Sequence, residues 1–353
     1  MSSMRARRFS FARCLVLAFI ASLALAGCGR TPAAPAQPAE DTPLLRIVAD
    51  PVVTMTQGAT LTLTLEERDA GGRIVTQAPD SYTWTSSEPG LVAVGAEGML
   101  TAGPGFGQAV VTVRSVSGTT ASARVWVQQP RGAPSAYRIT LIYADNVPDD
   151  WRELLDAAAA RWEEVIRAEL PEAILNNQPH ACNTAPGNPA PPPLTGVERG
   201  TRIFVSVSDG FPVDTYAEAL GGPCLQRPLP HPTTILGRIT LNAKKPLRDI
   251  PPGRRSYLAL HEMGHALGLV AIVQGFQPPW YDPKTERYTG PMGLEGYRRD
   301  YGASVPDLIA RGGHWPFYGD IMGGGSTSSR ISWASAGALM DLGYPATWYG
   351  AHD

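Results

Sequence analysis

The sequence predicts two folded units in series, an all-β sandwich followed by a larger α+β unit. Short β-type runs recur at close, regular spacing between residues 44 and 128. A break containing Pro and Gly follows at residues 129–134, and from residue 135 to residue 353 strand-like segments are mixed with helix-like ones. A chain of 353 residues with 43% hydrophobic content is long and apolar enough for ordinary globular cores in both units.

The N-terminal segment predicts export. Four arginines precede a largely apolar run of 13 residues, Cys14 to Ala26. Because a membrane-spanning helix needs roughly 20 residues, residues 1–27 fit a signal peptide rather than a span. The ending Leu-Ala-Gly-Cys at residues 25–28 resembles a bacterial lipobox, which implies lipid attachment at Cys28. Residues 28–43 are rich in Pro and Ala and predict an extended tether. We therefore expect an exported protein of the bacterial cell envelope, lipid-anchored at the outer membrane or cell surface.

Charge and cysteine content restrict the partners and the compartment. The signal peptide carries four of the 30 basic residues and none of the 32 acidic ones, so the remaining chain is acidic and has no feature that attracts nucleic acid. Of the four cysteines, only Cys182 and Cys224 lie in the predicted folded region. An exported location permits a disulfide, so we expect a bridge between these two cysteines, with two unpaired thiols as the alternative.

The first unit, residues 44–128, has the pattern of a small β-sandwich. Its predicted strands are Leu45 to Val48, Thr60 to Leu65, Tyr82 to Thr85, Val92 to Val94, Ala109 to Val113 and Arg124 to Val127. The segments 82–89, 91–94 and 98–102 together resemble the bacterial Ig-like group 2 domain. The unit has no cluster of His, Cys or carboxylates, so we expect it to act as a spacer or a binding module, with Trp84 in its core.

The second unit, residues 135–353, opens with a predicted strand from Tyr137 to Tyr143. A long helical pattern begins at Pro148 and continues to Leu170, where Pro171 stops it. Its apolar residues recur at helical spacing and give one buried face. Further strands are predicted at residues 202–207 and 237–241, and residues 176–196 are Pro-rich and predicted to be irregular. This order predicts an α+β layer arrangement with a mixed sheet and a mainly coiled and helical C-terminal part.

The helix predicted from Tyr257 to Leu269 carries the sequence His-Glu-Met-Gly-His at residues 261–265. His261 and His265 are four residues apart, so both imidazoles project from one helix face and can reach one metal ion. Zinc suits such ligands, since a catalytic zinc site has three protein ligands and an open fourth position. Glu262 lies beside the metal and is the candidate general base and acid for hydrolysis by an activated water.

The third ligand decides the kind of zinc site. In the compact metzincin pattern HExxHxxGxxH a third His would fall at position 271, where this chain has Ala271. Downstream of the helix only His314 and His352 remain, and His314 is followed by Trp315 and, eight residues later, by Met322. A thermolysin-like carboxylate ligand is the alternative, with Glu286 and Glu295 as its candidates.

These residues resemble the leishmanolysin family, whose metzincin site separates the Gly and the third His by an insertion and then has His-Trp and a Met-containing turn. Here 48 residues separate His265 from His314. The likeness extends through residues 288–291, 331–332 and 339–344. It implies one zinc ion bound by His261, His265 and His314, with Met322 under the metal and Trp315 and Asp320 structural. Because Cys28 is assigned to a lipid, no latency by a blocking cysteine is expected.

The sequence thus predicts a lipid-anchored zinc endopeptidase that acts on proteins or peptides. The alternative is a catalytically inert lipoprotein of the same fold that acts in binding or adhesion, and a zinc hydrolase of non-peptide amides is a third candidate. The strand at residues 237–241, just before the helix, is expected to pair with an extended substrate.

Overall fold

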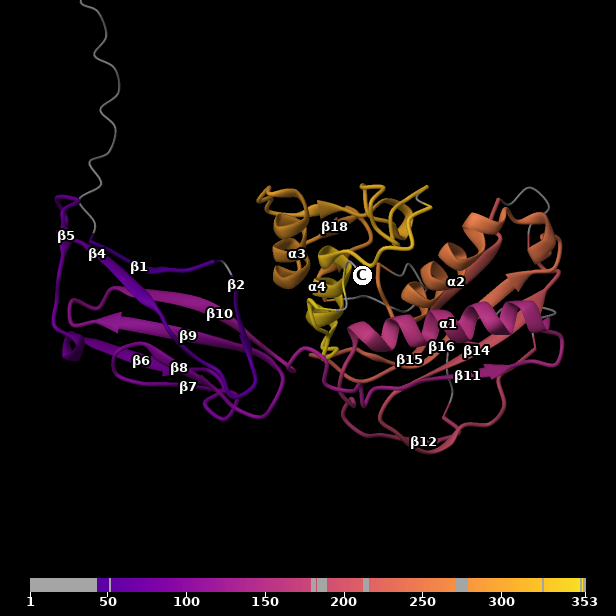
Figure 1. Ribbon diagram of the computed structural model, residues 1–353, viewed down its shortest axis with the longest axis horizontal. Helices are drawn as coiled ribbons and strands as arrows, with labels where there is room; N and C mark the ends of the chain where they lie inside the picture. Colours follow the sequence, from indigo (N-terminus) through magenta and orange to yellow (C-terminus); the bar gives the residue numbers. More distant parts are fainter. Residues whose placement is uncertain are drawn as a thin grey trace, which may run out of the picture.

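The computed structural model describes residues 43–50, 52–178, 182, 189–211, 216–270, 279–325, 327–349 and 351. An all-β N-terminal part and a mixed α+β part lie side by side along the long axis (Figure 1). The predicted signal peptide, Cys28 and the tether up to residue 42 lie outside the described residues. The first strand of the described residues begins at Leu44.

The N-terminal part consists of three small sheets. In the largest, strand order is β2-β10-β9-β6, with β2 parallel to β10 and the other pairs antiparallel. The other sheets are β1-β4-β5 and β3-β8-β7. The core includes Val92, Leu100, Val111 and Val125, and Trp84 packs against it while partly exposed. The strands are β1 Leu44–Val48, β2 Val52–Thr56, β3 Thr60–Thr62, β4 Thr64–Arg68, β5 Ile74–Val75, β6 Tyr82–Ser86, β7 Val92–Val94, β8 Met99–Ala102, β9 Gly107–Ser115 and β10 Thr120–Gln128.

The α+β part is built on a mixed sheet with the strand order β11-β14-β16-β15. Strands β11 (Ile139–Tyr143), β14 (Thr201–Ser208) and β16 (Thr234–Asn242) are parallel, and β15 (Ala219–Gln226) runs antiparallel at the edge. The prediction that residues 237–241 pair with substrate is wrong, because they lie within β16, which β14 and β15 flank. The sequence did not predict β15, since Gly221, Gly222 and Pro223 have weak β propensity.

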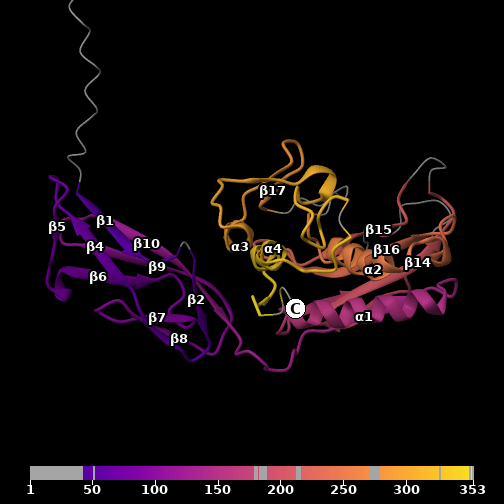
Figure 2. The ribbon, with the colours of Figure 1, turned by 45° about the horizontal axis from the view of Figure 1, so that its top comes forward.

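Two helices, α1 (Asp149–Val165) and α2 (Pro252–Ala266), cover one face of this sheet (Figures 1 and 2). Ile203 and Val205 of β14 face the helices, whereas Phe204 faces a smaller core on the other side. Helix α1 ends before the predicted Leu170 because the chain after Val165 leaves the helix to form a β-bridge between Ile166 and Ala346. This is a tertiary contact that no local pattern shows.

The C-terminal residues form a helical pair and short strands. Helices α3 (Pro291–Tyr301) and α4 (Trp333–Leu342) approach closely, because Gly296 and Gly337 leave room for the partner backbone. Asp341 of α4 accepts hydrogen bonds from the N–H groups of Met292 and Gly293 in the first turn of α3 (3.0 and 2.8 Å). The short strands are β12 Ala173–Asn176, β13 Thr195–Glu198, β17 Tyr281–Asp282, β18 Arg287–Tyr288 and β19 Leu308–Ile309.

The two parts are joined by a packed and hydrogen-bonded interface. Val52 and Trp126 of the N-terminal part are buried in the main core of the α+β part. Thr54 Oγ1 accepts hydrogen bonds from Arg299 Nη2 and Trp348 Nε1, both 3.2 Å long. The Arg299 guanidinium also lies over the Trp348 ring, 4.7 Å from its centre. These contacts fix the N-terminal part against the C-terminal residues.

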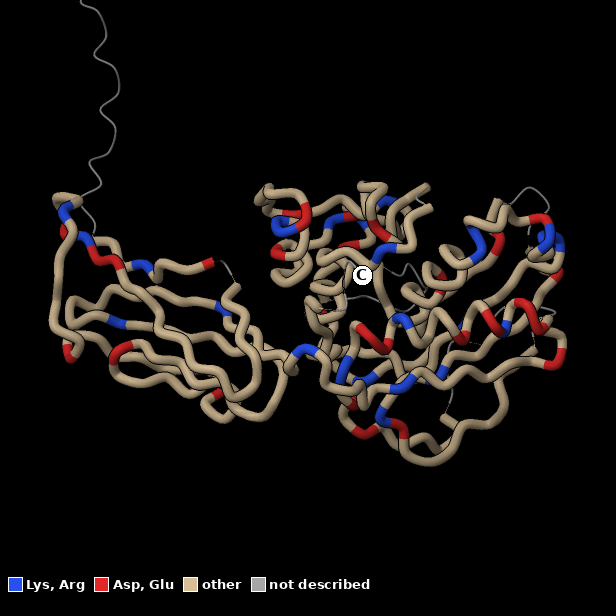
Figure 3. Tube along the Cα trace, in the orientation of Figure 1, with Lys and Arg blue, Asp and Glu red and all other residues tan. Residues whose placement is uncertain are grey.

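Charged residues of both signs are interspersed over the coloured trace of both parts (Figure 3). None of the helices in the described ranges has the length and apolar character that a membrane span requires.

A disulfide bond joins Cys182 and Cys224, the two cysteines for which the sequence predicts a bridge. Cys224 belongs to β15, so the bond ties the loop that contains Cys182 to the edge strand. Arg238 of β16 holds the same loop through hydrogen bonds to the carbonyl oxygens of Cys182 and Pro189.

We expect a variant with both Cys182 and Cys224 replaced by Ala to lose about 4 kcal/mol in the free energy of unfolding. The bond closes a loop with a sequence separation of 42, which restricts the unfolded chain. Urea unfolding of oxidised wild type and of the double variant measures the difference, and a loss below about 1 kcal/mol would contradict this account.

Candidate metal centre

Helix α2 presents the predicted motif on one buried face. Pro252 occupies its first turn, where a missing N–H costs nothing, and Gly268, with φ of 100°, takes the chain out of the helix direction. Tyr257, His261 and His265 follow one another at intervals of four residues, and all three line the same cleft. The predicted helix is therefore present, starting before Tyr257 and ending at Ala266.

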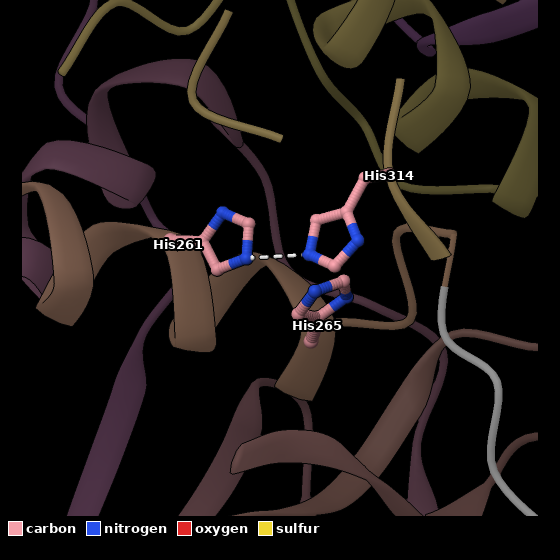
Figure 4. A group of neighbouring side chains, drawn as sticks. All are labelled: His261, His265 and His314. Carbon is pink, nitrogen blue, oxygen red and sulfur yellow. Dashed lines mark hydrogen bonds between the residues drawn. The ribbon is translucent and has the colours of Figure 1, made fainter. Parts of the chain in front are cut away.

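His314 joins the two helix histidines from a distant part of the chain. It follows the short 3-10 turn at Arg311–Gly313, and its ring lies beside those of His261 and His265 (Figure 4). One nitrogen from each ring lies within 4.8 Å of the others. The His261 and His314 rings stack with centres 5.0 Å apart, whereas His265 stands edge-on to both. The chain thus brings together the three histidines that the sequence singles out.

Backbone carbonyls fix the orientation of both helix histidines. His261 Nδ1 lies 2.7 Å from the carbonyl oxygen of Ile321, and His265 Nδ1 lies 3.0 Å from that of Leu269. A carbonyl only accepts, so each Nδ1 carries the proton and each Nε2 keeps a free lone pair. The lone pairs therefore point towards the centre of the cluster.

This donor set fits a metal ion. His261 Nε2 and His314 Nε2 are 3.1 Å apart, within hydrogen-bond distance of each other (Figure 4). Zn–N bonds of about 2.0–2.1 Å in tetrahedral geometry place two ligand nitrogens about 3.3 Å apart. The observed separation is close to that value.

Burial keeps the three imidazoles in the neutral form that a metal needs. It lowers the pKa of His261 to about 4 and the pKa of His265 well below its ordinary value. The pKa of His314 is also lowered by burial, although the ring is less enclosed. Burial thus favours the metal-binding form of all three rings.

Glu262 is buried beside the cluster and against the edge strand. Burial raises the pKa of its carboxyl to about 7, the backbone N–H of Gly221 lowers it by hydrogen bonding, and the charge of Glu218 raises it further. Gly221 lies so close to the backbone of Glu262 that a Cβ atom there would collide with the Glu262 carbonyl oxygen. Strand β15 thus holds the carboxyl through a position that only Gly can occupy.

Met322 lies beneath the histidines in a turn fixed by Asp320. A Cβ atom placed on Gly264 would be 2.5 Å from the Met322 sulfur, so the sulfur packs closely against helix α2 at this position. The buried Asp320 accepts hydrogen bonds from Met322 N–H (2.5 Å) and Ser332 N–H (2.9 Å). Trp315 N–H donates to the Met322 carbonyl at 2.8 Å. Asp320 and the backbone of Trp315 thus hold the turn that carries Met322.

The cluster opens into a cleft of about 310 Å³. Its walls come from the start of β15, from α2 and from residues 312–314. The two carboxylates considered as alternative third ligands do not belong to the cluster. Glu295 pairs with Arg298 and Arg299, and Glu286 accepts a hydrogen bond from the Gly312 N–H at 3.2 Å.

Some groups that shape the site were not identified from the sequence. Tyr257 lies four residues before His261, and this spacing could have predicted that its side chain lies on the same helix face as the two histidines. The N–H of Gly221 and the carbonyls of Ile321 and Leu269 have no such signal, because backbone groups exist at every residue and only the fold brings them to the site.

Comparisons with known proteins do not assign a family. No family model matches the sequence, and no curated protein matches it. Among solved structures, the chain is similar to an intimin mutant of EHEC O157:H7 (19% identity, 23% of this chain and 42% of that chain, TM-score 0.16). It is also similar to a bacterial Ig-like domain containing GH10 xylanase from termite gut (19% identity, 28% and 26%, TM-score 0.17) and to the Escherichia coli adhesin FdeC (15% identity, 30% and 37%, TM-score 0.20). The chain spans less than half the length of each of these proteins.

We expect Gly264→Ala to lower the free energy of unfolding by about 1–3 kcal/mol, because the new methyl group meets the Met322 sulfur and the Trp162 ring in a closely packed region. Gly253→Ala is the matched control in the same helix, where the added atom meets nothing within 4 Å and no loss is expected. Urea unfolding of both variants makes the comparison. Equal stability of the two would contradict the packing of Met322 described above.

We expect the stability of the metal-free protein to fall, relative to a Glu262→Gln variant, as pH rises from about 4.3 to about 7. The pKa of Glu262 is about 7 in the folded protein and about 4.3 in an unfolded chain, so the folded state binds this proton more tightly. The stabilisation by this proton is complete below about pH 4.3 and is lost by about pH 7, a change of up to about 4 kcal/mol in the free energy of unfolding. Unfolding curves in EDTA at pH 4–8 measure it, and parallel curves for both proteins would contradict the raised pKa.

Proposed function

We propose that this protein is an exported, lipid-anchored zinc endopeptidase of the leishmanolysin-like metzincin type that hydrolyses peptide bonds of proteins. The observation that carries the proposal is the convergence of three neutral imidazoles in one cleft beside the buried carboxyl of Glu262. The sequence His-Glu-x-x-His, a bend at Gly268 and a methionine turn below the metal ligands support it further.

Zinc is the ion that this donor set favours. Three neutral nitrogen ligands with an open cleft on one side match a catalytic zinc site, in which a fourth position stays free for water or substrate. His261, His265 and His314 would hold the ion. When bound there, zinc supplies the Lewis acidity that polarises a substrate carbonyl and acidifies a water molecule.

Glu262 moves the proton in this scheme. Its carboxylate takes a proton from the water as the water oxygen bonds to the carbonyl carbon of the scissile peptide. It then passes the proton to the nitrogen as the C–N bond breaks, which leaves a carboxyl and an amine product. A pKa of about 7 in the metal-free protein matches a group that must both accept and donate a proton near neutral pH. The Gly221 N–H holds the carboxyl while it does so.

The edge strand β15 is the substrate-binding element in this proposal. In this role β15 takes the place of residues 237–241, which lie in β16, between two other strands of the sheet. The start of β15, including Ala219 and Leu220, lines the cleft, and among the strands of the described residues only β16 pairs with β15. An extended peptide that paired with this edge would pass directly over the metal ligands.

The placement of the enzyme rests on the N-terminal sequence and on the disulfide. The bond between Cys182 and Cys224 fits an oxidising compartment outside the cytoplasm. Lipid attachment at Cys28 would anchor the chain to a membrane, and the Ig-like sandwich of residues 44–128 would then serve as a spacer or binding module. No latency through a blocking cysteine is proposed.

We expect the zinc-loaded wild type to cleave casein or gelatin, and expect Glu262→Gln to lose roughly 10²–10⁴-fold in rate because no base remains to take the water proton. Metal analysis of the same samples should show one zinc per chain in both proteins. A chelator should abolish wild-type cleavage, and added zinc should restore it. Wild type that binds zinc but cleaves no protein or peptide would contradict the proposal and support the inert binding lipoprotein.

The third ligand is tested in the same assay with His314→Ala, which should lose bound zinc and cleavage together. His231→Ala is the control, because His231 is exposed and lies outside the cluster. Undiminished zinc in His314→Ala would remove His314 from the ligand set.

A further inference from the structure

Tyr257 lies one helical turn before His261, on the face of α2 that carries the histidines. Its side chain is 4% exposed, and its ring centre lies 5.1 Å from that of His261, with the ring planes inclined by 31°. The residue also lines the cleft. A buried phenol that packs against an imidazole usually has a hydrogen-bond partner for its hydroxyl.

The hydroxyl of Tyr257 connects helix α2 to the turn below the histidines. Its oxygen is 3.1 Å from His261 Nδ1 and 3.5 Å from the carbonyl oxygen of Gly323. Since the Nδ1 proton is already directed to the Ile321 carbonyl, the arrangement that satisfies every group shares that proton between Ile321 and the phenol oxygen. The phenol O–H then points to Gly323. Two contacts thus join His261 to the turn at residues 320–323, one directly to the Ile321 carbonyl and one through the Tyr257 hydroxyl to the Gly323 carbonyl.

His261 differs in this respect from the other two histidines. The Nδ1 of His265 bonds to Leu269, only four residues further along the chain. The ring of His314 is hydrogen-bonded by the backbone of its own turn, residues 311 and 312. The carbonyl partner of His261 is instead 60 residues away in sequence, so local helix geometry does not set this contact. The Tyr257 hydroxyl lies where His261 meets this distant turn, near both His261 Nδ1 and the Gly323 carbonyl oxygen.

We propose that Tyr257 is a positioning residue for the metal centre, which holds His261 in its ligand orientation by joining its Nδ1 to the turn at residues 320–323. The inference rests on the proposed function, because it assumes that His261 binds zinc. Its consequence is that retention of the metal depends on the Tyr257 hydroxyl, although that hydroxyl lies on the side of His261 away from the cluster.

The test uses Tyr257→Phe in the full chain, stripped of metal and titrated with zinc alone in competition with a chromophoric chelator. Partners that orient a metal ligand typically change metal affinity by about 10–100-fold, so we expect the dissociation constant for zinc to rise by about tenfold. The zinc release rate should rise with it. Cobalt(II) added in place of zinc should give altered visible absorption bands, because the orientation of one ligand has changed.

Tyr137→Phe is the matched control. Tyr137 is also fully buried in the α+β part, and its hydroxyl donates a 2.7 Å hydrogen bond to Thr201 Oγ1, outside the histidine cluster. Both variants lose one buried hydroxyl, so the thermal unfolding temperatures of the metal-free proteins show the shared structural cost. Weaker zinc binding and an altered cobalt spectrum in Tyr257→Phe alone support the proposal.

Unchanged zinc affinity in Tyr257→Phe would overturn the inference, and so would an equal loss of affinity in both variants. If wild type bound no zinc, the proposed function and this inference would both fail. Wild type that binds zinc without cleaving peptides would overturn only the proposed function, because the affinity measurement still decides the role of Tyr257.

Discussion

Two hydrogen bonds, from the Nδ1 atoms of His261 and His265 to backbone carbonyls, determine what the rest of this site can do. An imidazole offers one lone pair in its neutral form, and the bond at Nδ1 decides that Nε2 carries it. The helix spacing then directs both lone pairs to one point, and His314 completes the group. Without these carbonyls each ring could present either nitrogen, and the spacing of four residues would not define a binding geometry.

The same arrangement has a cost in stability. Three imidazoles and a carboxyl are packed together away from water, and burial shifts all four pKa values away from their ordinary range. Close packing compensates around them, with the Met322 sulfur against Gly264 and the Trp162 indole N–H donating to the Leu260 carbonyl at 3.0 Å. Helix α2 thus packs against both α1 and the methionine turn. A metal ion would remove much of the remaining electrostatic cost, since its charge offsets the desolvation that the ligands have already undergone.

The sequence predicted the elements whose determinants are local. The helix with His261 and His265, the strands at residues 202–207 and 237–241, and the cysteine pair all follow from spacing, apolar periodicity or compartment. His314 was placed by resemblance to a family rather than by any periodicity. What could not be predicted depends on pairing across the fold. Strand β15 has Gly-Gly-Pro where strands usually have branched residues. For that reason β15 was not predicted, and substrate pairing was expected of residues 237–241 in the neighbouring strand β16 instead. The early end of α1 follows from a bridge to Ala346, far along the chain.

The distance in sequence between His261 and its supporting turn has a consequence for biogenesis. The helix histidines are complete by residue 265, but the carbonyl that orients His261 belongs to Ile321, and Ser332 and Ser335 hold the Asp320 that shapes this turn. A nascent or partly translocated chain that ends before these residues has the motif but not the geometry. Assembly of the centre therefore requires the chain to have emerged beyond Ser335. A metal site built in this way lacks its ligand geometry while the chain is still being made.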